Sequence, residues 1–87
     1  MYILFSLKDN KLYIGYSEKL SERISDHQNG KVRATKNRLP LKLIHYEAFT
    51  NKKDAKSRET FLKSGFGRSQ LKKALQNRLK QLNYKLL

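Results

Sequence analysis

The sequence predicts one small domain of the α/β class in its α+β form, with elements in the order β-β-α-β-α-α. Two observations support this prediction. A chain of 87 residues is too short to divide into several hydrophobic cores. The spacing of apolar residues also changes along the chain between the alternation typical of strands and the three-and-four spacing typical of helices. With no internal repeat or linker, the domain is expected to span residues 1–87.

Two strands are predicted at residues 2–7 and 12–17, around a polar turn. Asp9 and Asn10 tolerate a left-handed turn, and a two-residue loop there sets the register. Three pairs then form the core face of the hairpin: Leu7 with Leu12, Phe5 with Ile14, and Ile3 with Tyr16. Tyr2 and Tyr13 share the opposite face, about 13 Å apart along the strands, so their rings have to lean together to share a site.

The remaining elements are expected in the order helix, strand, helix, helix. A helix begins at Leu20, with Ser17 or Ser21 as its cap, and stops at Gly30. An apolar strand is predicted over residues 42–49, and a helix over residues 51–64 that ends before Gly65. After a short connection at residues 66–68, one last helix has an apolar stripe: Leu71, Ala74, Leu75, Leu79 and Leu82.

The charge of the chain indicates a polyanionic partner. Twenty Lys and Arg residues against seven Asp and Glu give a net charge of +13. Residues 31–41 form a loop with four cations and no acid: Lys31, Arg33, Lys36 and Arg38. In a chain of balanced charge such a run is usually a solvated surface, but at +13 we expect it to bind nucleic-acid phosphates.

Composition excludes several classes of protein. The chain has no cysteine, which excludes disulfides, thiolate metal sites and a cysteine nucleophile. It has no apolar run long enough to cross a bilayer and no charged signal-peptide start, so a cytoplasmic protein without a membrane partner is expected. The small core leaves no room for a large cavity, so we expect no small-molecule cofactor.

Several polar residues occupy core-like positions. Tyr2 and Tyr13 share one strand face, Arg23 and His27 lie one helical turn apart, and Glu59 falls on an apolar helix face. A buried charge needs a partner or a metal ion. Hydrolysis of a phosphodiester needs a carboxylate for a divalent cation, a positive group for the developing charge and a base for water. The set contains one of each.

Each residue also has a purely structural interpretation. Glu59 could form a salt bridge with Arg23 or Arg58, and a single His27 on a helix face is usually structural. The two tyrosines could pack as cross-strand aromatics. Gly15 could form a bulge or make room for a tyrosine ring. The combination is therefore more informative than any one residue.

That combination resembles the GIY-YIG nuclease family. Tyr2-Ile3-Leu4 and Tyr13-Ile14-Gly15 resemble the two halves of its signature, although Met1 stands where the name has a glycine. The other family positions follow in order along the chain: Arg23 and His27 on the first helix, Glu59 as the single metal-binding acid, and Lys63 as the basic residue one turn later. Residues 55–68 particularly resemble small stand-alone bacterial members.

The resemblance implies a three-stranded antiparallel sheet flanked by helices, and a divalent-metal-dependent endonuclease that hydrolyses phosphodiester bonds of DNA. It implies five catalytic residues: Tyr2, Tyr13, Arg23, His27 and Glu59. Glu59 would hold one Mg²⁺ or Mn²⁺, Arg23 would neutralise the phosphoryl group, and Tyr2 would orient water. Either Tyr13 or His27 would be the general base. Gly15 and Lys63 would lie against the nucleic acid.

The alternative is a non-catalytic nucleic-acid-binding protein with the same fold. Charge does not separate the two functions, because both bind phosphate. Glu59 separates the two functions, since a site that only binds phosphate gains nothing from an acid. Attachment to an anionic membrane would need free apolar residues on the last helix, where the leucines are required for the core. DNA is favoured over RNA as the partner, and the oligomeric state is left open.

Overall fold

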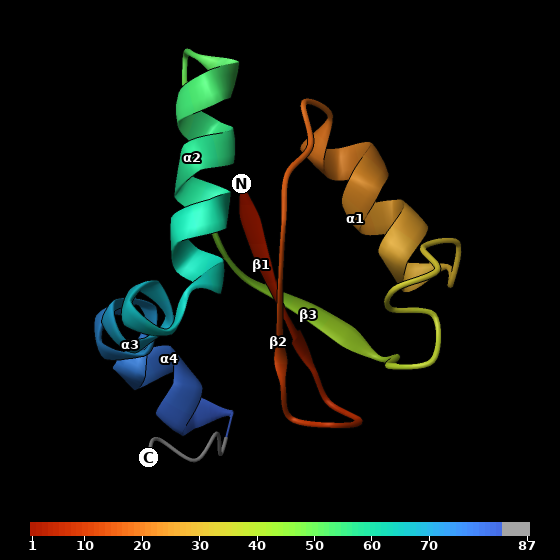
Figure 1. Ribbon diagram of the computed structural model, residues 1–87. Coiled ribbons are helices and arrows are strands. Elements are labelled where there is room, and N and C mark those ends of the chain that lie inside the picture. The colour runs from red at the N-terminus through yellow and green to blue at the C-terminus, as the bar shows by residue number, and fades with distance from the viewer. Residues whose placement is uncertain (83–87) are drawn as a thin grey trace.

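The computed structural model describes residues 1–82 and contains a three-stranded sheet and four helices (Figure 1). The strands are β1 (Tyr2–Ser6), β2 (Leu12–Gly15) and β3 (Leu41–Tyr46), and the helices are α1 (Leu20–Gln28), α2 (Lys52–Lys63), α3 (Gly65–Ala74) and α4 (Gln76–Gln81). The strand order is β2-β1-β3, and both pairings are antiparallel. The predicted fold class and order of elements are confirmed. The last five residues of the expected 1–87 domain lie outside the described residues.

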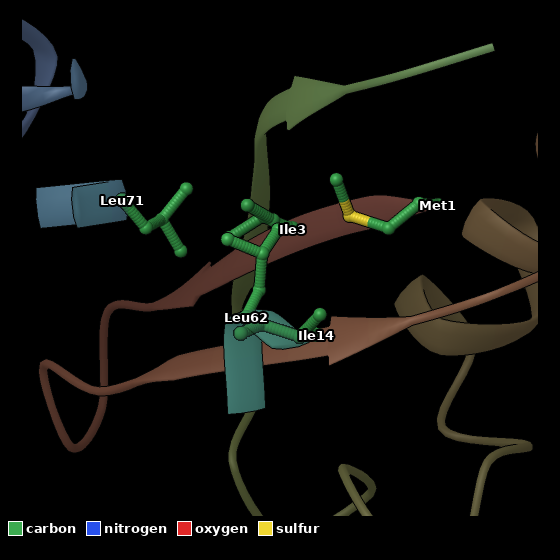
Figure 2. Close-up of a cluster of buried hydrophobic side chains, with 5 residues drawn as sticks. All are labelled: Met1, Ile3, Ile14, Leu62 and Leu71. Atoms are coloured by element: carbon green, nitrogen blue, oxygen red, sulfur yellow. The ribbon is translucent and has the colours of Figure 1, made fainter. Parts of the chain in front are cut away.

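Strand β1 is buried on both faces, because it is central and helices cover both sides of the sheet (Figure 1). On one face Ile3 and Ile14 pack with Met1, Leu62 of α2 and Leu71 of α3 (Figure 2). On the other face Tyr2 and Leu4 pack with Leu41, and Leu20 and Ile24 of α1 lie against them. The prediction of a single core face is wrong, since the tyrosine face is also core.

The β1–β2 register differs from the predicted one by two residues. Tyr2 pairs with Gly15, Ile3 with Ile14, and Leu4 with Tyr13. The turn takes four residues, because the Ser6 hydroxyl accepts bonds from the two amides of residues 8 and 9, and the Asp9 carboxylate accepts one from residue 11. An even shift keeps the side chains that remain in the two strands on their predicted faces.

The shift has two consequences for the predicted hairpin. Leu7 leaves the core and is 49% exposed in the turn, where Asn10 takes the left-handed conformation with φ of 58°. Tyr13 now lies opposite Leu4, only two residues from the Tyr2 pairing instead of about four. The two tyrosine rings are therefore diagonal neighbours and do not have to lean across the sheet.

Helices α1 and α2 begin and end close to the predicted positions. Asn51 caps α2 by accepting a bond from the Lys53 amide. The capping prediction for α1 is wrong: the N-cap residue is Lys19, and Ser17 accepts a bond from its amide outside the helix. Gly30 follows α1 with φ of 72°, as expected for a glycine that ends a helix.

The last predicted helix begins earlier than expected and is divided in two. Ser64 ends α2 and caps α3, because its hydroxyl donates to the Phe61 carbonyl and accepts from the Gly67 amide. Residues 66–68, predicted as a connection, are therefore helical. A Cβ on Gly67 would collide with the Phe61 carbonyl, so this glycine allows α3 to start tightly against α2. The helix breaks at Leu75, where neither proline nor glycine occurs.

Candidate active site

The predicted site residues lie around the edge strand β2. Tyr2 comes from the neighbouring strand β1, Arg23 and His27 come from α1, and Glu59 comes from α2. Helices α1 and α2 lie on opposite sides of β2 in Figure 1. Because β2 has no further strand beside it, side chains from both helices can approach along its free edge.

His27 is fully buried and both of its ring nitrogens are engaged. Nε2 lies 2.8 Å from the Tyr2 hydroxyl, and Nδ1 lies 2.7 Å from the Thr35 hydroxyl. A neutral imidazole has one donor and one acceptor nitrogen, so these two bonds use its full capacity. Thr35 is also fully buried, and it anchors the loop between α1 and β3 to the site. Sequence reasoning missed it, because a lone threonine in a basic loop gives no signal.

Arg23 lies close enough to Tyr2 for its guanidinium to act on the phenol, whose hydroxyl is bonded to His27. Burial raises the pKa of the Tyr2 phenol, and the nearby guanidinium of Arg23 opposes that rise. Burial also lowers the pKa of His27, and the positive charge of Arg23 lowers it further. At neutral pH the phenol is therefore protonated and the imidazole is uncharged.

Tyr13 packs against the rings of Tyr2 and His27. Its ring centroid lies 5.2 Å from that of His27, edge to face, and 6.3 Å from that of Tyr2. Gly15 makes room for these rings: a Cβ built on it would lie 2.6 Å from the hydroxyl oxygen of Tyr2. The structure thus gives Gly15 the space-making role, while contact with nucleic acid remains a prediction.

Glu59 is close enough to act electrostatically on Tyr2, where its negative charge raises the phenol pKa. The carboxylate is 21% exposed and accepts a 2.9 Å bond from the Lys63 ammonium, one helical turn away. The two salt-bridge partners considered from the sequence are wrong: Arg58 pairs with Glu47, and among the described residues no ion pair joins Arg23 to Glu59. Lys63 is exposed, with its charge directed at Glu59.

The donor set suits a cation that needs few protein ligands. Within residues 1–82 no group of three or more His, Cys, Asp or Glu side chains is arranged to hold a metal ion. Mg²⁺ keeps several waters and often binds through one or two carboxylates together with substrate phosphates. A single half-buried carboxylate beside phosphate-binding groups therefore fits Mg²⁺ or Mn²⁺, and it does not fit a zinc cage.

Arg23 opens onto a groove of about 400 Å³ between α1 and α2. Lys52 and Lys56 line its α2 wall, and Tyr16 lines the wall beside β2. Three acids also line the groove: Glu18, Glu22 and Asp26. The Arg23 side chain therefore borders an open groove whose lining carries both signs of charge.

The four cations of the basic loop divide into two groups. Lys31, Arg33 and Lys36 are exposed, and no ion pair joins them to another residue of the described chain. Arg38 is half-buried, and its Nε lies 2.6 Å from the Asp9 carboxylate. The acid comes from the β1–β2 turn, so the sequence of the loop alone does not predict this ion pair.

An α+β domain that brings a carboxylate, a guanidinium and three proton-bearing rings together beside one edge strand has the groups used in phosphoryl transfer. The family model of the GIY-YIG catalytic domain matches residues 1–74. The chain belongs to the GIY-YIG family. Its catalytic domain implies a nuclease-type activity on a nucleic acid substrate.

The chain is similar to several small bacterial proteins. It is 38% identical to a UPF0213 protein of Clostridium perfringens over 97% of this chain and 90% of the relative. It is 42% identical to a UPF0213 protein of Lactococcus lactis over 82% of this chain and 74% of the relative. It is 40% identical to a UPF0213 protein of Staphylococcus haemolyticus over 82% of this chain and 87% of the relative. Their names state no activity. No solved structure matches the chain significantly, and no helix within residues 1–82 is long and apolar enough to cross a membrane.

Proposed function

We propose that this protein is a divalent-metal-dependent endonuclease that hydrolyses phosphodiester bonds of DNA. The main support is the convergence of five side chains from four elements on one edge strand. Tyr2 and His27 are joined by a hydrogen bond, Tyr13 packs against both rings, and Arg23 and Glu59 lie within electrostatic reach of Tyr2. A purely structural cluster would not need a guanidinium and a carboxylate beside two tyrosines.

Arg23 and Tyr2 would act on the scissile phosphate and the attacking water. The guanidinium can bind phosphate oxygens and neutralise the charge that develops on the phosphoryl group. The Tyr2 hydroxyl is buried and bonded to His27, so the water that it would orient has to approach on the side of Arg23. Glu59 would hold the single Mg²⁺ or Mn²⁺, which supplies Lewis-acid stabilisation to the phosphate and the leaving oxygen.

Tyr13 is the better candidate for the general base. His27 is fully buried and both of its nitrogens are already bonded, so no nitrogen is left to take a proton from water. Tyr13 is only half-buried and lies on the edge strand, where water can reach it. His27 would then be a positioning residue that fixes the Tyr2 hydroxyl.

Phosphates away from the reacting centre would bind the exposed cations of the loop. Lys31, Arg33 and Lys36 follow α1, which bears Arg23 and His27, and Thr35 ties the same loop to the His27 ring. Binding of DNA to this loop would therefore place the backbone beside the site. Lys63 would reach the substrate once Glu59 is engaged elsewhere.

A second candidate function is nucleic-acid binding without hydrolysis. The observation in its favour is the Glu59–Lys63 pair, which gives the acid a purely structural partner. In that case Glu59 stabilises α2 and the cationic surface alone binds the ligand.

Cleavage assays on the purified protein separate the two functions. Supercoiled, branched and single-stranded DNA, with single-stranded RNA beside them, are incubated with Mg²⁺, Mn²⁺ or EDTA. The proposed function predicts cleavage of DNA with either ion and none with EDTA. Binding without cleavage of any substrate would favour the second candidate, and preferential cleavage of RNA would contradict the choice of DNA.

A further inference from the structure

A second cationic recess lies at the other end of the edge strand, away from Gly15. Its volume is about 410 Å³, and it is lined by Lys11, Leu12, Ile14, Arg38, Arg68 and Lys72. The four cations come from three separate segments: the β1–β2 turn, the end of the basic loop, and α3. Leu12 and Ile14 of β2 supply an apolar floor.

The cations of this recess are gathered against their mutual repulsion. Arg68 and Lys72 lie four residues apart on α3, a spacing at which like charges destabilise a helix. Among the described residues no acid lines the recess. Asp9 lies outside the recess and accepts bonds from Nε and Nη2 of Arg38. Nη2 also donates to the Leu12 carbonyl, and this bond fixes the guanidinium against β2. The summed positive charge of the lining attracts an anion.

We propose that this recess binds a backbone phosphate of the nucleic acid substrate. The scissile phosphodiester bond of the same molecule would lie at Arg23 and Glu59. The choice of a nucleic acid as the ligand rests on the proposed function. From Gly15 to Leu12 the strand rises by about 10 Å, a length that spans more than one phosphate of a DNA backbone and at most about three base-pair steps at 3.4 Å of rise along the helix axis. The DNA backbone then follows the free edge of β2, and the recess binds a phosphate about one to three nucleotides from the scissile bond.

Binding in EDTA tests the recess without any cleavage. The double variant Arg68→Gln/Lys72→Gln removes two of its cations, and Lys73→Gln/Lys80→Gln removes two exposed cations that do not line it. The affinity for a short duplex is measured over a series of salt concentrations. Each phosphate contact contributes about −0.9 to the slope of log K against log salt, so the recess variant should flatten it by about 1–2 units and the control by much less. Equal slopes in the two variants would overturn the proposal.

A neutral phosphate analogue locates the contact. Methylphosphonates are placed singly at about one, two and three nucleotides from the cleavage point; one of them should weaken binding by the wild type and should not weaken binding by Arg68→Gln/Lys72→Gln any further. Additive losses at all three positions would mean that the recess contacts none of these phosphates. If the wild type never cleaves DNA, the proposed hydrolysis fails, while the salt slopes still decide whether the recess binds the backbone.

Discussion

Replacing Gly15 with alanine places a methyl group where the Tyr2 ring lies. A Cβ on Gly15 would lie 2.6 Å from both Cζ and the hydroxyl oxygen of Tyr2, and 3.1 Å from Cε1 of Tyr13. Tyr2 is 1% exposed and its hydroxyl is bonded to His27, so the ring has no free direction in which to move. Overpacking a core costs about 1–3 kcal/mol, and each kcal/mol lowers the Tm of a domain of this size by about 4–8 °C. We expect Gly15→Ala to melt about 4–24 °C below the wild type.

The matched control is Gly65→Ala, at the start of α3. A Cβ there meets no atom of the described chain within 4 Å, so this variant should melt at or slightly above the wild-type Tm. Both melts are followed by circular dichroism, and the imidazole NMR signals of His27 report whether the Tyr2 contact is displaced. Equal melting of the two alanine variants, with unchanged His27 signals, would refute the close packing of Tyr2 over Gly15.

Three further predictions concern the site, the loop and the turn. Tyr13→Phe should lower the single-turnover cleavage rate by about 10²–10⁴-fold, and His27→Gln should lower it less; the reverse order would make His27 the base. Removing Arg33 and Lys36 together should flatten the salt slope of duplex binding by about 1–2 units with little change in saturating cleavage, and an unchanged slope would exclude the loop as a contact. The pKa of Asp9 is lowered to about 2 from 3.8 by its bond to the loop guanidinium, so Asp9→Asn should lose up to about 1 kcal/mol at neutral pH. That deficit, measured by urea unfolding, should disappear as the pH falls from about 4 towards 2, and a deficit that does not depend on pH would contradict the ion pair.

The sequence was sufficient for the fold class, the order of the elements and the face of each strand residue. Alternation determines the face of a residue, and an even change in turn length leaves that face unchanged. The register was not predictable from alternation, because the turn length depends on the Ser6 and Asp9 side chains that bind its amides. The break between α3 and α4 at Leu75 has no sequence signal that we can identify.

For the site, the sequence predicted which residues come together better than it predicted their partners. The five selected side chains share one region because they lie on elements that meet at β2. The bonds of His27 to Thr35 and of Glu59 to Lys63 depend on side-chain directions that spacing alone leaves open. Arg38 illustrates the same limit, since its acid is supplied by a turn 29 residues away in the chain.

The most direct test of the account is single-turnover cleavage of DNA by Glu59→Gln, measured with Mg²⁺ and with Mn²⁺ beside the control Asp54→Asn. Asp54 is an exposed acid on the same helix, so the control removes an equal charge away from the site. We expect Glu59→Gln to lose cleavage while it keeps its fold and its affinity for DNA, and Asp54→Asn to cleave at the wild-type rate. Cleavage by folded Glu59→Gln at the wild-type rate would contradict the assignment of Glu59 as the metal-binding acid.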